Sequence, residues 1–286
     1  LFHLARQIND PALLAMAYLQ VSPFYQGKFK EARQLLERAS ALKDINFQRH
    51  LALRYGMAPA VVALSYLSNC LLIMGYPEQS IMINQQALEL IEQINHPMTA
   101  CYVISRSCWM ALIRNETKHL GTQSEQLFQT AHKHGFRNFE IGAVFFKNWL
   151  SVIENNEPLQ AINAMQNSTE SYHLTKTILN LTAFLLFFAK ACLQKGLTSQ
   201  GLNAINESIA LGEKTAERWL QAEAWRIKGH LHLQSQEHQP RGNVNDTEAF
   251  RCFKTSYEIA KAQGAKLWEL RAAMSMAEVY DSKGEG

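Results

Sequence analysis

The stretch Gly75–Pro97, GYPEQSIMINQQALELIEQINHP, holds one unit of the pattern that decides the fold of this chain. It opens with a glycine turn and then reads as a helix. A small side chain, Ser80, follows shortly after the turn, and another, Ala87, comes about two helical turns later. Small side chains at fixed places on a helix allow an antiparallel partner to approach closely. The stretch therefore predicts one member of a tightly packed helix pair.

Turns of the same kind recur along the whole chain at intervals of roughly 40 residues, which is the signature of stacked helix–turn–helix units. Small residues recur in phase with the turns and a mostly bulky set precedes them, so that adjacent helices can interdigitate. The turns are Gly27, Gly75, Asn115, Asn156, Gly196, Gln236 and Gly284. The small residues are Ala32, Ser80, Ala161, Gly201 and Ala249, then Ala39, Ala87, Ser168, Ser208 and Ser256, with Leu120 and Leu127 as misfits. The bulky residues are Met16, Leu64, Ile104, Phe145, Leu185 and Trp225, with Ala273 closing the array.

The segments between the turns are predicted to be helical almost throughout. Asp10 followed by Pro11 is typical of an N-cap and the first residue of a helix. The predicted fold class is all-α: a right-handed superhelix (α-solenoid) of about six helix pairs plus a C-terminal capping helix, in one domain over residues 1–286. The expected pairs are a helix opening at 11–18 with 28–42, 58–74 with 78–94, 98–114 with 118–134, 139–154 with 158–166, 174–195 with 199–214, and 217–234 with 246–263, followed by the capping helix at 266–283.

Two segments interrupt the repeat, and each holds one of the longer intervals between turns. Residues 43–57 are expected to join the first two helix pairs. Residues 236–246, QEHQPRGNVND, are expected to form a mobile surface loop because they are polar and contain proline and glycine. Gly135 and Gly264 are expected to end second helices, as glycine commonly does.

Composition and charge narrow the classes of function. The chain has 286 residues, 47% of them hydrophobic, and a formal net charge of only +3. It has no run of Lys and Arg of the kind that binds phosphate backbones, so we expect no nucleic-acid partner. The most apolar stretch, residues 178–193, is interrupted by Asn180, Thr182 and Lys190 and is too short to cross a membrane.

Further features favour a cytoplasmic location. No signal peptide is visible, and because the chain begins with Leu1 rather than Met, we expect it to be part of a longer protein. The 5 cysteines lie inside apolar helical patterns without a C-x-x-C spacing, which favours buried thiols in a reducing compartment. These cysteines are Cys70, Cys101, Cys108, Cys192 and Cys252.

The small and large positions around each turn resemble the tetratricopeptide repeat (TPR). Three stretches are more specific: residues 75–97, quoted above; EKTAERWLQAEAWRIKGHLHL at 213–233; and AFRCFKTSYEIAKAQGAKLWELRAAMSMAEVY at 249–280. They resemble the C-terminal TPR region of bacterial signal-transduction proteins that carry a STAND-type ATPase module and often a class III adenylate/guanylate cyclase domain. The chain departs from that pattern at Asn115, Leu120 and Gln236, where glycine or a small residue is expected.

The resemblance implies a regulatory, protein–protein interaction role, with catalysis in modules outside this chain. No phosphate-binding GxxxxGK[ST] loop is present, so we expect no ATP binding of that kind, no enzymatic activity and no cofactor. The expected partner is a protein or peptide, for which an acidic segment is one candidate, or another domain of the same polypeptide. The alternative is a small-ligand sensor that controls a neighbouring ATPase, cyclase or DNA-binding module.

First helices of such repeats line the concave face of the superhelix, and residues beside their packed positions form the candidate binding site. Charges about 40 residues apart in sequence become neighbours when repeats stack. The set is mildly basic and would suit an acidic peptide or a carboxylate, with an exposed Trp109 as an aromatic anchor. The candidates are Asn69, Trp109, Lys147, Lys190, Glu223, Arg226, His230 and Arg271.

Neither a metal site nor a catalytic thiol is expected. His230 and His232 are two residues apart, so on a helix they point to different faces and cannot easily share one metal ion. His238 lies in the polar loop, and no Asp or Glu completes an obvious ligand set. Cys70 and Cys108 lie in no sequence context that is recognised for a nucleophile, and we expect them in the core.

Overall fold

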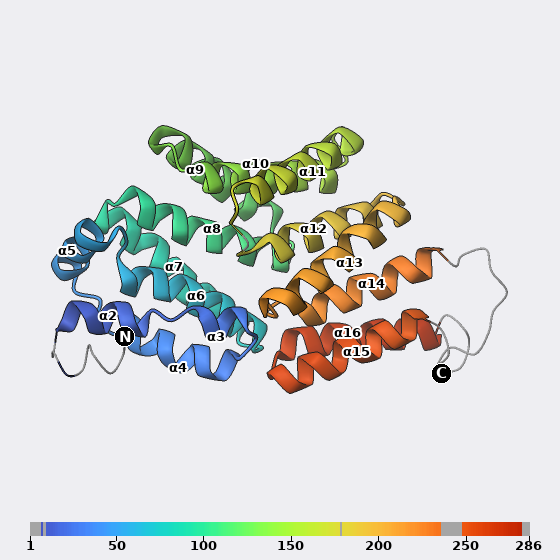
Figure 1. Cartoon of the computed structure of the whole chain (residues 1–286), viewed down its shortest axis with the longest axis horizontal. Coiled ribbons are helices and arrows are strands. Elements are labelled where there is room, and N and C mark those ends of the chain that lie inside the picture. The colour runs from blue at the N-terminus through green and yellow to red at the C-terminus, as the bar shows by residue number, and fades with distance from the viewer. Residues whose placement is uncertain (1–6, 8–9, 178, 236–247, 282–286) are drawn as a thin grey trace. The chain divides into compact units, whose positions relative to one another are not determined.

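The computed structural model describes residues 7, 10–177, 179–235 and 248–281. Helices make up nearly all of this part of the chain, and it contains no strand (Figure 1). The chain divides into two compact units, Leu1–Phe24 with Lys28–Leu150 and Tyr25–Gly27 with Ser151–Gly286. The all-α expectation is confirmed, whereas the expectation of one domain over residues 1–286 stays a prediction.

The first unit is built from helices that pack on their neighbours in the sequence. α4 packs on α6, α6 on α7, and α8 on α9. Packing of this kind is consistent with an α-solenoid. The helices are α2 (Pro11–Tyr18), α3 (Ser22–Tyr25), α4 (Phe29–Ser40), α5 (Ile45–Tyr55), α6 (Pro59–Ile73), α7 (Pro77–Ile94), α8 (Pro97–Arg114), α9 (Thr117–His134) and most of α10 (Arg137–Ile153).

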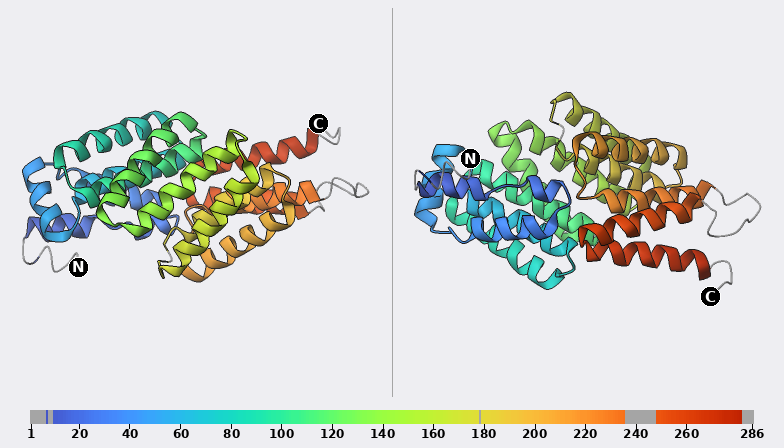
Figure 2. Two further views of the ribbon diagram at one scale, coloured as in Figure 1. Left: turned by 90° about the horizontal axis from the view of Figure 1, so that it is seen from above. Right: turned by 60° about the horizontal axis from the view of Figure 1, so that its bottom comes forward.

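The second unit continues the same arrangement. α12 packs on α13 and α14 on α15, while α16 covers both α14 and α15 as the closing helix (Figures 1 and 2). A helix thus lies where the last one was expected, and its role as a cap stays a prediction. The helices are α11 (Pro158–Leu174), α12 (Leu181–Gln194), α13 (Thr198–Thr215), α14 (Gln221–Ser235), α15 (Glu248–Gln263) and α16 (Lys266–Asp281).

Residues 25–27 belong to the second unit although they lie near the start of the chain. The Tyr25 hydroxyl donates a hydrogen bond to Asn180 Oδ1 at 3.1 Å, and its ring packs edge-on against Trp219. The backbone carbonyl of Tyr25 accepts hydrogen bonds from the N–H groups of Arg218 and Trp219. Because Tyr25 and Trp219 are both buried, Tyr25 forms part of the core of the second unit.

The glycine turns between paired helices adopt the left-handed backbone that the pattern predicts. The φ angle is 73° at Gly27, 91° at Gly75 and 72° at Gly196. Side chains strain this conformation, so glycine favours the sharp reversal that an antiparallel helix pair needs. The predicted turns at Gln236 and Gly284, like the predicted loop 236–246, lie outside the described residues.

Asparagine replaces glycine in two of the turns. Asn115 has a φ of 58°, so the departure from the expected glycine leaves the turn intact, because asparagine tolerates the left-handed region. In the next turn the left-handed residue is Asn155, one place before the predicted Asn156. Gly135 and Gly264, with φ of 70° and 66°, end second helices as expected.

The predicted small residues lie where helices meet. All ten are buried, and so are the two misfits, Leu120 and Leu127. Three of the serines also donate a hydroxyl hydrogen bond to a backbone carbonyl of the partner helix, which satisfies the buried polar atom at the point of closest approach. These bonds join Ser80 to Ser68 at 2.7 Å, Ser208 to Thr182 at 2.8 Å, and Ser256 to Ala222 at 2.6 Å.

The bulky set is only partly buried. Leu64, Ile104, Phe145 and Leu185 are in the core. The remaining three are partly exposed, so the large–small alternation is strictest in the middle of the array. These three are Met16, Trp225 and Ala273.

Residues 43–57 join the first two helix pairs as expected, and they do so through a helix that the pattern did not predict, α5 (Ile45–Tyr55). Asp44 caps its start by accepting a hydrogen bond from the Phe47 N–H at 2.8 Å, and Gly56 ends it with a φ of 79°. The predicted end of one other helix was wrong. α11 continues to Leu174, well past the predicted end at residue 166. Its last turns are held by Tyr172, whose ring stacks on Phe184 with centroids 4.6 Å apart.

No single helix among the described residues is long and apolar enough to cross a membrane. α5 and α6, which are bent by 97° at their junction, pass the criteria of length and composition only when they are taken together.

We predict that Gly229→Ala, in the middle of α14, lowers the free energy of unfolding by about 1–3 kcal/mol through overpacking. A Cβ at this position would meet the ring of Phe253, which is fully buried and has no room to withdraw. Urea denaturation of the purified variant measures the loss.

Gly121→Ala in α9 is the matched control. A Cβ there would lie 3.6 Å from Leu150 Cδ1, which is an ordinary contact, so the better helix propensity of alanine should raise stability by about 0.5–1 kcal/mol. Equal stability of the Gly229→Ala variant and the unmodified chain would mean that α14 and α15 do not approach as closely as described.

Candidate functional site

Most of the predicted site residues meet in the second unit, where they form a cluster that we call the ionic network. Lys190 comes from α12, Glu223, Arg226 and His230 from α14, and Arg271 from α16. The spacing of three and four residues along α14 puts its members on one face. The expectation that stacking makes neighbours of charges about 40 residues apart is thus confirmed for α12, α14 and α16.

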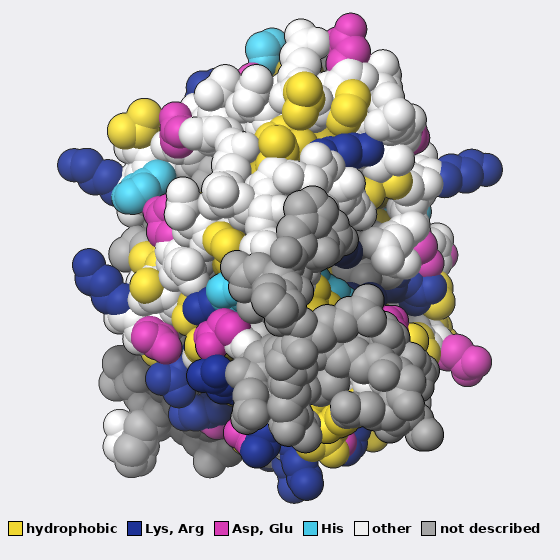
Figure 3. Space-filling view, turned by 90° about the vertical axis from the view of Figure 1, so that its right-hand side faces the viewer, with side chains coloured by type: hydrophobic (Ala, Val, Ile, Leu, Met, Phe, Trp, Pro, Cys, Tyr) yellow, Lys and Arg dark blue, Asp and Glu magenta, His cyan; other side chains and the backbone are white. Residues whose placement is uncertain are grey.

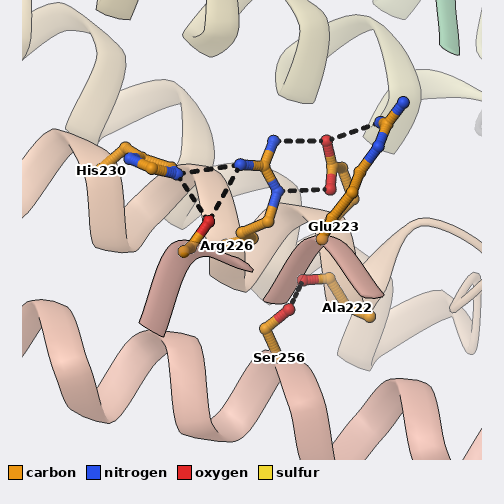
Figure 4. A network of polar contacts seen from close by, with 7 residues as sticks. Ala222, Glu223, Arg226, His230 and Ser256 are labelled. Atoms are coloured by element: carbon orange, nitrogen blue, oxygen red, sulfur yellow. Dashed lines mark hydrogen bonds and ion pairs between the residues drawn. The ribbon is translucent and has the colours of Figure 1, made fainter. Parts of the chain in front are cut away.

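Glu223 is the centre of the network (Figure 4). Its carboxylate is 2% exposed and accepts two hydrogen bonds from the Arg226 guanidinium, both 2.8 Å long. Arg271 Nη1 lies 3.3 Å from the Glu223 Oε1 atom. Burial alone would raise the pKa of Glu223, but the positive charges of Arg226, Arg271 and Lys190 outweigh burial and lower the pKa to about 2. The carboxylate is therefore ionised at neutral pH.

His230 is a neutral hydrogen-bond acceptor at the edge of the network. Its Nε2 atom lies 2.9 Å from Arg226 Nη1 and 2.9 Å from Ser275 Oγ on α16. Because a guanidinium can only donate, Nε2 must carry the lone pair and Nδ1 the proton. Burial, and then the charge of Arg226, lower the pKa of His230 to about 4. His230 therefore adds no positive charge at neutral pH.

Lys190 makes the network carry more cations than its carboxylate balances. Burial and the charges of Arg271 and Arg226 lower the pKa of Lys190 to about 8, although Glu223 acts in the opposite direction. The side chains of Arg226 and Arg271 remain 15% and 23% exposed. Three cations thus surround the buried carboxylate of Glu223, and the side chains of both arginines reach the surface.

The remaining predicted residues lie in the first unit, where two expectations were wrong. Trp109 is only 2% exposed and packs against Phe145 and Phe146, so it is a core residue and presents no aromatic anchor. Asn69 is fully buried, and its amide donates to backbone carbonyls, including that of Arg106 at 3.1 Å. Both residues are buried because α6 and α8 are packed on all sides, so a position beside the packed face is not exposed.

Lys147 is the third of these residues and stays partly exposed on α10. Its ammonium lies 2.6 Å from Glu125 Oε2 on α9 and over the ring of Phe128, 4.2 Å from the ring centroid. Its charge is therefore already matched by a carboxylate, and Lys147 does not join a larger basic set.

The sequence reasoning missed a pocket of about 670 Å3 in the first unit. Asn84 on α7 and His119 on α9 line it, and both contact the buried Ser107 of α8. The Asn84 amide donates to Ser107 Oγ at 3.0 Å, while its own Oδ1 atom is buried without a hydrogen-bond partner. Ser107 Oγ lies 2.9 Å from His119 Nε2, but Ser107 is fully buried and cannot act as an exposed nucleophile.

Side chains of both charges are exposed on the face of the molecule that Figure 3 shows, where Lys and Arg lie among Asp and Glu. This agrees with the small net charge of +3. The ionic network is a local arrangement that could give a preference for an anionic partner despite this small net charge.

We predict that Glu223→Gln lowers the free energy of unfolding by about 3–5 kcal/mol at pH 7, because it removes the carboxylate that balances two guanidinium groups in a buried setting. The pKa of Glu223 falls from an ordinary 4.5 to about 2 on folding. Its ionisation therefore stabilises the fold above pH ~4.5, and this stabilisation is lost as the pH falls towards 2. The variant should lack that pH dependence in urea denaturation.

Glu258→Gln, on the exposed side of α15, is the control and should change stability by less than about 0.5 kcal/mol. If the two variants unfold at the same urea concentration, the network does not stabilise the second unit.

No family model matches the chain. Among curated proteins, the chain is similar to "Uncharacterized protein R02095" of Rhizobium meliloti (strain 1021), with 22% identity over 258 residues. The similar region covers 90% of this chain but only 24% of the length of that protein. In the Rhizobium protein, the region that resembles this chain is therefore a minor part of a much longer polypeptide.

Proposed function

We propose that this chain is a non-catalytic interaction module that binds an acidic segment, either of another protein or of another domain of the same polypeptide, at the ionic network. The observation that carries the proposal is that three cations, Lys190, Arg226 and Arg271, outnumber the buried carboxylate of Glu223 and the exposed Glu278, whose charge also acts on Arg226. Lys190 keeps its charge against burial and against two guanidinium groups. A carboxylate brought by a partner would supply the missing negative charge.

The geometry of the network favours recognition over stability alone. Glu223 holds the Arg226 guanidinium by two parallel hydrogen bonds, so its orientation is fixed before a partner arrives. Electrostatic attraction is stronger in a partly buried site than in open water, because the effective dielectric constant is lower. One additional carboxylate would then contact groups that are already in place.

The same proposal includes the way in which the helix pairs stack. The helix pairs, their left-handed turns and their buried small residues support a TPR-like right-handed superhelix with the network on its concave face. We place the module in a longer bacterial signalling protein of the STAND ATPase or cyclase type, where it would act in the cytoplasm. The sequence resemblance is the support for this context, and the much longer Rhizobium relative fits it.

We predict that Lys190→Met raises the free energy of unfolding at pH 7 by about 1–3 kcal/mol, because the pKa of Lys190 is lowered to about 8 and its charged form is therefore disfavoured in the fold. The same substitution should weaken binding of a fluorescent hexaglutamate peptide about tenfold or more, since the ionic network loses a cation. Fluorescence anisotropy at 50 and 300 mM salt measures the binding.

Lys254→Met, an exposed substitution on α15, is the control and should change hexaglutamate binding little. Equal losses from both variants would mean that diffuse charge attraction holds the peptide. A Lys190→Met chain that is less stable, yet binds as before, would show that Lys190 has a structural role only.

The pocket at Asn84 supports a second candidate, a small-ligand sensor. The buried Oδ1 atom of Asn84 has no partner, so the pocket offers an unused acceptor to a ligand with a hydroxyl or amide donor. Asn84→Leu should abolish the thermal stabilisation by any hit from a library of small polar metabolites, whereas Gln129→Leu outside the pocket should retain it. A hit that stabilises all three chains equally would place the ligand elsewhere.

A further inference from the structure

Three metal-ligating side chains of the second unit converge at a place that the ionic network does not use. His232 on α14, with Glu248 and Cys252 on α15, each offer one ligand atom, and these atoms all lie within 4.8 Å of one another. Glu248 is the first residue of α15 and Cys252 follows one turn later, so both lie on one face of that helix. Because α14 packs directly on α15, this face meets His232.

His232 carries an independent sign that a partner is missing. Its Nε2 atom is buried and has no hydrogen-bond partner within the described residues. Buried polar atoms in folded proteins are nearly always paired with the protein, with water or with an ion. His230, two residues earlier, faces the ionic network instead, where it contacts Arg226 and Ser275. The expectation that the two histidines face different ways is confirmed, but the expectation that no Asp or Glu completes a ligand set was wrong, because Glu248 lies beside His232.

We propose that His232, Glu248 and Cys252 form a binding site for a divalent transition-metal ion, and that Zn2+ fits this ligand set best. Imidazole nitrogen, thiolate sulfur and carboxylate oxygen are the usual zinc ligands, at about 2.0–2.3 Å from the ion. Ligand atoms around a tetrahedral ion lie about 3.3–3.8 Å apart, so side-chain movements of about 1 Å would close the site. Calcium and magnesium prefer oxygen ligands alone, so the sulfur and nitrogen disfavour them.

The charges around the site can support a divalent ion. Burial lowers the pKa of His232, which leaves the ring neutral and able to ligate at neutral pH. Burial also raises the pKa of Cys252 to about 11, so the thiol must release its proton to the solvent when the metal binds. The thiolate and the Glu248 carboxylate together then balance the two charges of the ion.

Two cations oppose the metal and limit its affinity. The charge of Lys228 acts on both His232 and Cys252. The Arg251 guanidinium lies 3.5 Å from Glu248 and would compete for its carboxylate. Lys228 is also positioned over the ring of Trp225, at 4.9 Å from the ring centroid. Removal of the Lys228 charge should therefore strengthen metal binding.

The test is a titration of the whole chain, residues 1–286, with Co2+, whose absorption bands report both thiolate ligation and tetrahedral geometry. We expect one equivalent of Co2+ to produce a thiolate-to-cobalt charge-transfer band, and Zn2+ to displace it. Cys252→Ser should remove the band. His232→Gln and Glu248→Gln should each weaken Co2+ binding about tenfold or more, and Lys228→Gln should tighten it by about twofold to tenfold.

Cys101→Ser, which removes an equally buried thiol in the first unit, is the matched control and should keep the band. Circular dichroism of each variant shows that it is folded before it is titrated. The proposal is overturned if the unmodified chain gives no charge-transfer band, if folded Cys252→Ser retains it, or if folded His232→Gln and Glu248→Gln bind Co2+ as tightly as the unmodified chain.

Discussion

The distance at which two helices can pack is the constraint on which the rest of this structure depends. A helix pair closes tightly only where one member presents a small side chain, since a larger one would hold the backbones apart. Ser208 and Ser256 show the consequence most directly, because each donates its hydroxyl to a backbone carbonyl of the helix opposite. Such a bond is possible only at close approach, and it satisfies the buried serine hydroxyl.

The same close packing explains why charges can be buried in the second unit. α16 covers α14, so the carboxylate of Glu223 is cut off from water. A buried carboxylate keeps its negative charge only when it is paired with cations, which here are guanidinium groups. The network that results satisfies Glu223, and its three cations outnumber the carboxylates of Glu223 and Glu278 that act on them. In a protein selected for stability alone, an apolar residue at position 190 would be the simpler solution. This imbalance is what distinguishes the network from an ordinary internal ion pair.

Much of the fold could be predicted from the sequence because the repeat is local. The phase of Ala32, Ala161 and Ala249 is fixed by nearest-neighbour packing, and each proves to be buried. Helix ends were harder to place. Residues 167–174 contain serine, threonine and tyrosine, which have modest helix propensity, and only their packing on α12 keeps them helical. α5 was missed because its capping residue Asp44 lies in a segment that differs from the repeat.

The candidate site could be predicted only where it obeys the same periodicity. Lys190, Arg226 and Arg271 were found because stacking brings equivalent positions together. The burial of Trp109 could not be read from its own helix, since it is determined by Phe145 and Phe146 on α10.

The repeat pattern also could not predict contacts between residues that occupy different positions in their repeats. Asn84 meets Ser107 across two helices, and His232 meets Cys252 at the open end of a pair. Neither contact follows from the repeat period, because the partners do not occupy equivalent places in successive units.

The early segment 25–27 has a consequence for the order of events during synthesis. Tyr25 leaves the ribosome long before Asn180 and Trp219, the residues that it contacts in the second unit. Helical repeats usually fold one after another as they leave the ribosome, but the second unit cannot complete its core without a segment that is translated well before the rest of it. Its contacts span much of the chain, which slows folding relative to a purely local array. A fragment that began at residue 151 would therefore lack part of its own core, namely Tyr25.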